Sequence, residues 1–151
     1  MHRRIERPLG NLCDFAVAGR ELERLAIPSD AMNRRVVRVS SSVGDLALVL
    51  DDCRLRDGDV VYADAQRVIA VAVEPDDVIV ARPATIAAAI EHAHAHGNRH
   101  HPIQREGDVL IVRYSDPIAA LCESRGVPWL RTRRVLQEPF IAPPAPHEHS
   151  A

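Results

Sequence analysis

Residues 77–101 read DVIVARPATIAAAIEHAHAHGNRHH, and this stretch predicts a strand followed directly by a helix. Its first residues are rich in β-branched side chains, which favour an extended backbone. Thr85 can cap the helix that follows, and the alanines favour helix up to His96 because alanine has the highest helix propensity. Gly97 is expected to follow the helix C-cap. A strand–helix unit therefore organises the second half of the chain.

The residues after this stretch continue the pattern. Residues 102–114 alternate around a Glu-Gly-Asp turn and predict a hairpin. Residues 115–126 predict a second helix, because they begin with a capping serine and a proline near the first helical position and end with glycine. Residues 127–135 supply a closing strand. Residues 77–137 therefore predict the order β-α-β-β-α-β, which is that of a split-βαβ or ferredoxin-like fold.

The first half of the chain predicts a small all-β unit. Short runs rich in valine, isoleucine and leucine alternate with turn residues, and little helical periodicity is present. Residues 20–32 predict a loop or a strand that leads to a turn. The expected strands are residues 9–17, 34–40, 46–50, 60–63 and 68–73.

The predicted fold class is α+β, with a β-rich N-terminal domain before a ferredoxin-like domain. A proline and three acids at residues 74–77 mark the boundary. We expect residues 1–74 to form the first domain and residues 75–138 the second. Residues 139–151 contain four prolines and are predicted to be a disordered tail that carries histidine.

Composition narrows the function classes. The chain has 151 residues, and its net charge of -2 provides no basic field, so we expect no nucleic-acid partner. No apolar run approaches the roughly 20 residues of a membrane span, and no secretory signal is recognisable. Cys13, Cys53 and Cys122 are widely spaced and form neither a disulfide framework nor a zinc knuckle. A cytoplasmic protein without a membrane partner is expected.

Histidines are concentrated in two short runs, which predicts a metal site. Neutral imidazole is the commonest side-chain ligand for borderline metals. By ligand type, Ni(II), Zn(II) and Cu(II) suit such a site about equally. The seven candidate ligands among the eight histidines are His92, His94, His96, His100, His101, His147 and His149.

Helix geometry places the histidines of the first run, residues 92–101, on different faces of the helix. His92 and His96 are neighbours at i and i+4 and can contact one ion together, whereas His94 points about 200° away. If the helix frays near its end, His100 and His101 approach the same face. One or two bonds per chain leave the ion incompletely coordinated, which favours completion by a second subunit. The alternative is a solvated helix end whose imidazolium groups interact with the helix dipole.

A catalytic function is not indicated by the sequence. It contains no His-Glu-x-x-His, no Gly-x-Ser-x-Gly and no phosphate-binding glycine-rich loop. No cysteine has an evident histidine partner. A hydrolytic metalloenzyme is disfavoured because no general base lies at a useful spacing from the histidines. We therefore expect a protein that is not an enzyme.

Two motifs give the chain a resemblance to a known family. Residues 97–100 read Gly-Asn-Arg-His and are followed by Pro102 and Gln104. Residues 55–62 read Leu-Arg-Asp-Gly-Asp-Val-Val-Tyr. Over residues 9–140 the chain resembles the urease accessory protein UreE family, whose members are nickel metallochaperones.

The resemblance implies a partner-binding N-terminal domain and a metal-binding C-terminal domain that joins a homodimer. It further implies Ni(II) as cargo, held between subunits and passed to the urease apoprotein through accessory proteins that include a GTPase. At the position of the family's shared histidine this chain has Ala95, so that His94 or His96 is expected to replace it. The alternative is an interaction module of the urease assembly complex with weak or lost metal binding.

Overall fold

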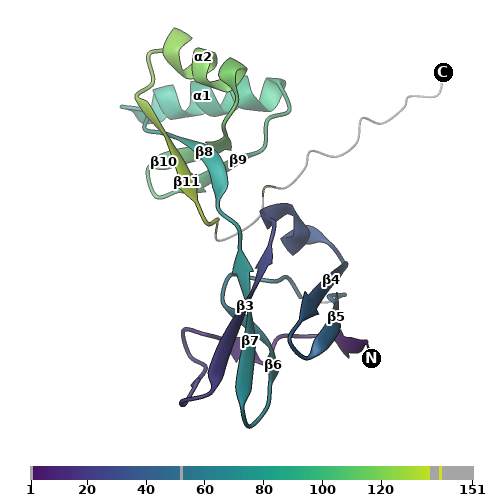
Figure 1. The fold of residues 1–151 in the computed structure, drawn as a ribbon. Coiled ribbons are helices and arrows are strands. Elements are labelled where there is room, and N and C mark those ends of the chain that lie inside the picture. The colour runs from purple at the N-terminus through teal and green to yellow at the C-terminus, as the bar shows by residue number, and fades with distance from the viewer. Residues whose placement is uncertain (1, 52, 137–139, 141–151) are drawn as a thin grey trace, which may run out of the picture. The chain divides into compact units, whose positions relative to one another are not determined.

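The protein divides into two compact units, which are seen in the computed structural model in Figure 1. The structure describes residues 2–51, 53–136 and 140. The chain passes from the first unit to the second between Pro75 and Asp76, and Val135 and Leu136 are again part of the first unit. Each unit has its own hydrophobic core.

The N-terminal unit contains two sheets and a 3-10 helix, Ser29–Asn33. The four-stranded sheet has the order β2-β6-β7-β3, with bounds β2 Gly10–Asn11, β6 Asp59–Ala63, β7 Arg67–Val73 and β3 Glu21–Ile27. The three-stranded sheet has the order β1-β5-β4, with bounds β1 Arg3–Ile5, β5 Gly44–Val49 and β4 Val36–Ser41.

One apolar cluster joins these two sheets. Ile27 and Ile69 contribute from the larger sheet, and Leu46 and Leu48 from the smaller one, all at most 1 % exposed. Met32 from the 3-10 helix completes the cluster. Burying a side chain of this size stabilises the folded state by roughly 1.5–3 kcal/mol, so the alternating apolar positions decide which strand faces turn inward.

The structure confirms most of the predicted N-terminal strands and corrects one. The strands expected at residues 34–40, 46–50, 60–63 and 68–73 are present, and residues 20–32 form a strand followed by the 3-10 helix. The strand expected over residues 9–17 is wrong, because only Gly10–Asn11 is extended.

Asn11 explains why that strand stops. Its Oδ1 accepts a hydrogen bond from the Cys13 N–H at 3.2 Å, and its carbonyl accepts from Asp14 and Phe15 at 2.9 and 2.8 Å. Asparagine readily satisfies nearby backbone donors in this way and so closes a turn. The apolar residues that follow are therefore in a loop.

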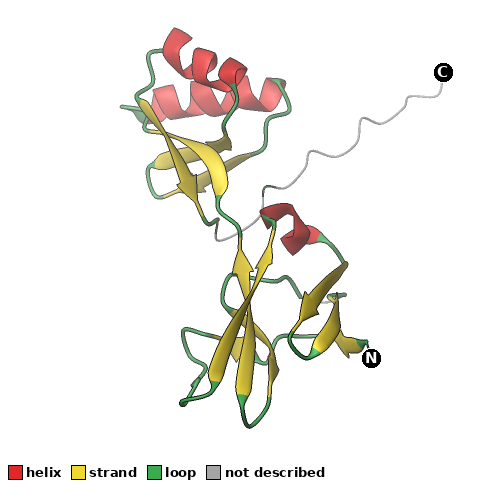
Figure 2. Ribbon diagram, in the orientation of Figure 1, coloured by secondary structure: helices red, strands yellow, loops and turns green. Residues whose placement is uncertain are grey.

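The C-terminal unit has the predicted ferredoxin-like order. All pairings in its sheet are antiparallel, and the strand order is β11-β8-β10-β9. Figure 2 shows both helices on one face of this sheet. The bounds are β8 Asp76–Ala81, α1 Ile86–Asn98, β9 Ile103–Glu106, β10 Val109–Arg113, α2 Asp116–Ser124 and β11 Trp129–Arg134.

Both helices begin with the predicted side-chain caps. Thr85 Oγ1 accepts from the Ala88 N–H at 3.0 Å, and Ser115 Oγ accepts from the Ile118 N–H at 3.4 Å. Each cap satisfies a backbone donor that has no partner inside the helix. Within the described residues, no helix is long and apolar enough to cross a membrane.

The helix α2 ends at a glycine, as predicted. The Val127 N–H donates to the Cys122 carbonyl at 3.0 Å, and the Gly126 N–H donates to the Glu123 carbonyl at 3.0 Å. Gly126 has a φ of 64°, the left-handed conformation that this type of helix end requires.

The end of α1 corrects the prediction for Gly97. The helix continues through Asn98, and Gly97 is helical. The His101 N–H donates to the His96 carbonyl and the His100 N–H to the Gly97 carbonyl, each at 3.0 Å. His100, with a φ of 57°, therefore takes the left-handed place that was expected for Gly97. The alanine-rich helix is thus two residues longer than expected and includes the glycine.

Candidate metal centre

Two helices bring three metal-binding side chains together inside the C-terminal unit. His92 and His96 lie one turn apart on α1, and their Nε2 atoms are 3.1 Å apart. Cys122 of α2 has its Sγ 3.7 Å from His92 Nε2. One donor atom from each residue lies within 4.8 Å of the others, and all three side chains are 0 % exposed. Donor atoms this close can contact a single ion.

A third imidazole extends this cluster toward the surface. His101 Nδ1 lies 3.2 Å from His96 Nδ1, and the side chain of His101 is half-buried. The rings of His92 and His96 meet edge to face, with centroids 4.5 Å apart. The three rings therefore form a chain from the core to the end of α1.

Burial keeps these imidazoles neutral. It lowers the pKa of His96 to about 4, with further lowering by the charges of His92 and His101. Burial also lowers the pKa of His92 and that of His101, and the nearby charges of Arg125 and Arg99, respectively, act in the same direction. A neutral imidazole has a free lone pair, so at pH 7 these residues are in the form that binds metal.

The thiol of Cys122 is also neutral in the metal-free protein. Burial raises its pKa, and the neighbouring Glu123 carboxylate raises it further. A bound cation would replace this thiol proton, because the thiolate is the form that ligates metals. The cluster thus has no net charge until an ion enters.

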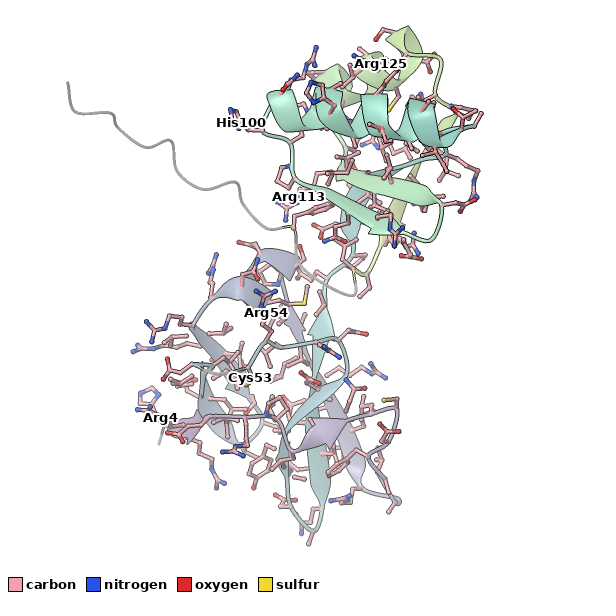
Figure 3. All side chains as sticks on the ribbon, turned by 180° about the vertical axis from the view of Figure 1, so that it is seen from behind. Arg4, Cys53, Arg54, His100, Arg113 and Arg125 are labelled. Carbon is pink, nitrogen blue, oxygen red and sulfur yellow. The ribbon has the colours of Figure 1, made fainter. Side chains whose placement is uncertain are left out.

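The other histidines of α1 are outside this cluster. His94 is exposed, and its Nε2 lies 3.0 Å from Asn98 Nδ2. His100 is exposed, and Figure 3 shows it at the end of α1 with its side chain directed away from the unit. Ala95 is buried, and its carbonyl accepts from Arg99 at 3.0 Å. Of the two histidines that flank Ala95, only His94 is open to solvent.

Cys122 is the ligand candidate that the sequence analysis missed. The inference that no cysteine has a histidine partner was wrong, because His92 lies beside the Cys122 thiol. The signal that could have revealed it is the apolar face of the second helix, on which Cys122 lies with Ile118 and Leu121. In a ferredoxin-like fold both helices cover the same sheet face, so that face meets the first helix.

Two candidate ligands belong to the tail of the chain. His147 and His149 lie outside the described residues. Phe140 is described and buried, and its ring lies 5.3 Å from the Arg113 guanidinium carbon. The prediction of a disordered segment from residue 139 onward otherwise falls on residues beyond the described part of the chain.

Comparison with known proteins identifies the family. The model for the UreE urease accessory protein, N-terminal domain, matches residues 5–74. A urease accessory protein UreE of Corynebacterium efficiens is 40 % identical over 121 residues, which is 78 % of this chain and 81 % of that protein. The chain belongs to the UreE family. The resemblance carried by residues 97–100 and 55–62 is therefore confirmed.

The similarity to UreE proteins includes both units. The UreE of Bacillus sp. strain TB-90 is 32 % identical over 147 residues, covering 96 % of this chain and 98 % of that protein. The UreE of Geobacillus kaustophilus is 32 % identical over 138 residues, covering 90 % and 93 %. Since the first of these matches covers nearly the whole chain, it includes α1 and α2. The family is one of urease accessory proteins.

Proposed function

We propose that this UreE family member is a nickel metallochaperone, which binds Ni(II) and delivers it to the urease maturation complex. Relatives that match most of the chain are named urease accessory protein UreE. The histidines at the end of α1 provide suitable ligands, since imidazole binds Ni(II), Zn(II) and Cu(II) readily. On this proposal Ni(II) is cargo, Zn(II) or Cu(II) can take its place, and the protein has no catalytic turnover.

The solvent exposure of each histidine decides whether it can transfer an ion to an acceptor protein. A delivered ion must be reached by the ligands of the acceptor, so at least part of its coordination sphere faces solvent. His94 and His100 are exposed and His101 is half-buried, whereas His92 and His96 are 0 % exposed. We therefore propose His94, His100 and His101 as the exchangeable nickel ligands, with His147 and His149 adding capacity from the tail.

The backbone of His100 is the single observation that carries this assignment. Its φ of 57° is a left-handed conformation, which costs a residue with a Cβ atom roughly 1–2 kcal/mol relative to glycine. Strained residues of this kind concentrate at functional sites, where their side chain repays the cost. An exposed imidazole gives no packing in return, so metal binding is the contribution that its position supports.

Few exposed ligands per chain favour a shared ion. Three imidazoles leave an ion of six-coordinate preference partly open, and a second copy of the chain can complete it. We therefore propose a homodimer joined through the C-terminal unit, with residues 75–138 as the metal-binding and dimerisation domain.

Residues 1–74 would bind partners, namely the urease apoprotein and accessory proteins that include a GTPase, in the cytoplasm. All three thiols of the chain are free, as in a reducing compartment.

Calorimetric titration with Ni(II) tests the proposal. We expect about one tight ion per dimer, and at least a tenfold loss of affinity in His94→Ala/His100→Ala. His2→Ala is the matched control, because His2 is an exposed histidine of the N-terminal unit. Unchanged affinity in the double variant would overturn the assignment of these ligands.

The second candidate function is an interaction module of the urease assembly complex that has weak or lost metal binding. Ala95 favours it, since this buried methyl group cannot ligate where the resemblance implies a histidine. The same titration separates the two functions. A parent protein that binds no Ni(II) but still co-purifies with urease accessory proteins would support the interaction module.

A further inference from the structure

The buried cluster of His92, His96 and Cys122 is not explained by the exchange of nickel. Cys122 belongs to an apolar core that includes Ile79 and Val112, and the two histidines are buried beside it. Placing two imidazoles there costs solvation free energy that apolar residues of the same volume would avoid. A polar cluster in such a place therefore requires a function of its own.

The spacing of the donor atoms fits one tetrahedral ion. With metal–nitrogen bonds of about 2.0–2.1 Å and metal–sulfur bonds of about 2.3 Å, two nitrogens are roughly 3.3 Å apart and nitrogen and sulfur roughly 3.6 Å apart. The observed distances are 3.1 Å between His92 Nε2 and His96 Nε2, and 3.7 Å between His92 Nε2 and Cys122 Sγ. The donor atoms of the third pair, His96 and Cys122, lie within 4.8 Å of each other. A side-chain shift of up to roughly 1 Å would therefore bring all three donors to one ion.

The hydrogen bond of His96 suits its metal-bound tautomer. An ion bound by both Nε2 atoms leaves the ring protons on Nδ1. His96 Nδ1 lies 3.2 Å from His101 Nδ1 and would donate to it, which fixes the orientation of the His96 ring. His92 Nδ1 is buried and has no hydrogen-bond partner within the described part of the chain.

We infer that His92, His96 and Cys122 form a second metal site that binds one borderline divalent ion of the Zn(II) class and joins α1 to α2. The thiol proton of Cys122 leaves to solvent as the sulfur–metal bond forms. The thiolate offsets part of the charge of the ion, which matters because Arg99 and Arg125 lie near the cluster. Three protein ligands leave the fourth position to a water molecule or a small anion.

This site shares no ligand with the proposed nickel site, although the nickel ligand His101 lies beside His96, and it does not depend on nickel delivery. Its residues are 0 % exposed, so no acceptor protein can reach them while the helices stay packed. An ion held there stabilises the packing of α1 against α2, because its ligands come from both helices. Removing the exposed ligands His94 and His100 leaves all three of its donors in place.

Cobalt(II) absorption spectroscopy tests the inference, because Co(II) binds at zinc sites and its absorption spectrum depends on the ligands that it binds. The protein used is Cys13→Ser/Cys53→Ser, in which Cys122 is the remaining thiol. We expect one equivalent of Co(II) per chain to give an intense thiolate-to-cobalt charge-transfer band together with strong tetrahedral d–d bands. Added Zn(II) should remove both by displacement. Cys122→Ser in the same background should lose the charge-transfer band, and His94→Ala should retain it.

The His101 imidazole beside His96 provides an independent measurement. His101→Ala should keep the charge-transfer band, which reports only the site that contains Cys122. The Co(II) affinity read from that band should weaken by roughly tenfold or more, as expected for loss of an orienting partner. A folded Cys13→Ser/Cys53→Ser protein that shows no charge-transfer band with Co(II) overturns the inference, and this outcome requires no variant of the cluster itself. If the Co(II) spectrum shows only weak octahedral bands, the exposed imidazoles alone bind Co(II). That result overturns the buried site but not the nickel proposal.

Discussion

His100 occupies the same place at the end of α1 that Gly126 occupies at the end of α2. Both have a left-handed backbone, with φ of 57° and 64°. In each helix the residue after them donates its N–H to a carbonyl five residues earlier, and those carbonyls belong to His96 and Cys122. Two equivalent helix ends therefore hold two of the three donors of the buried cluster.

His100→Gly should increase the free energy of unfolding by about 1 kcal/mol, because glycine adopts the left-handed conformation without the Cβ penalty. Urea denaturation at pH 7 with a chelator measures this. The matched control is Gly126→Ala, which introduces the same penalty at the equivalent place and should destabilise by a similar amount. A destabilised His100→Gly protein would show that the imidazole contributes packing.

Gly97→Ala should also stabilise the isolated chain, by roughly 0.5–1 kcal/mol. Gly97 is helical, and an added Cβ would meet no atom within 4 Å. Alanine restricts the unfolded chain and favours helix at this place. Urea denaturation at a concentration where the protein is monomeric measures the change. If the variant is less stable, the glycine has a structural role that the single chain does not reveal.

The metal-free protein should lose stability as the pH falls from about 6.5 to 4. The pKa of His96 is about 4 when folded, against about 6.5 when unfolded. Between these values the unfolded chain binds more protons, so lowering the pH favours unfolding, by at most about 3 kcal/mol for this residue. The lowered pKa values of His92 and His101 act in the same direction.

Urea denaturation at about pH 7.0, 5.5 and 4.0, which span the interval from about 6.5 to 4, measures this dependence. His96→Leu removes one of the titrating groups and should reduce the dependence over this range, leaving the part due to His92 and His101. A parent protein whose stability is the same at the first two values would contradict the buried neutral state of His96.

Thr85→Ala should destabilise the C-terminal unit by about 1 kcal/mol. The variant removes the hydroxyl that accepts from the Ala88 N–H and leaves this donor without its partner inside the chain. Thermal unfolding followed by circular dichroism measures the effect. Thr85→Ser is the matched control, since serine keeps the accepting oxygen, and it should restore most of the lost stability. Equal losses in both variants would exclude a capping role.

The order of the elements in the C-terminal unit was predictable because each signal is local. Capping residues such as Thr85 and Ser115 are recognisable from the residues that follow them, and alternating apolar side chains mark the strands. The pairing of His92 with His96 was also predictable, since an i, i+4 spacing fixes neighbours on one helix. In the N-terminal unit, the strand expected over residues 9–17 failed because Asn11 closes a turn that outweighs the apolar pattern.

Sequence alone determined the ferredoxin-like order, the helix starts and a histidine-rich segment near the end of the first helix. Only the tertiary structure decided which histidines are buried, that Cys122 joins them, and that His100 rather than Gly97 reverses the chain. The physical reason is the range of the interactions. Periodicity relates residues within one element. His92 and Cys122 are thirty residues apart in sequence, and they come into contact because their two helices pack on the same face of one sheet.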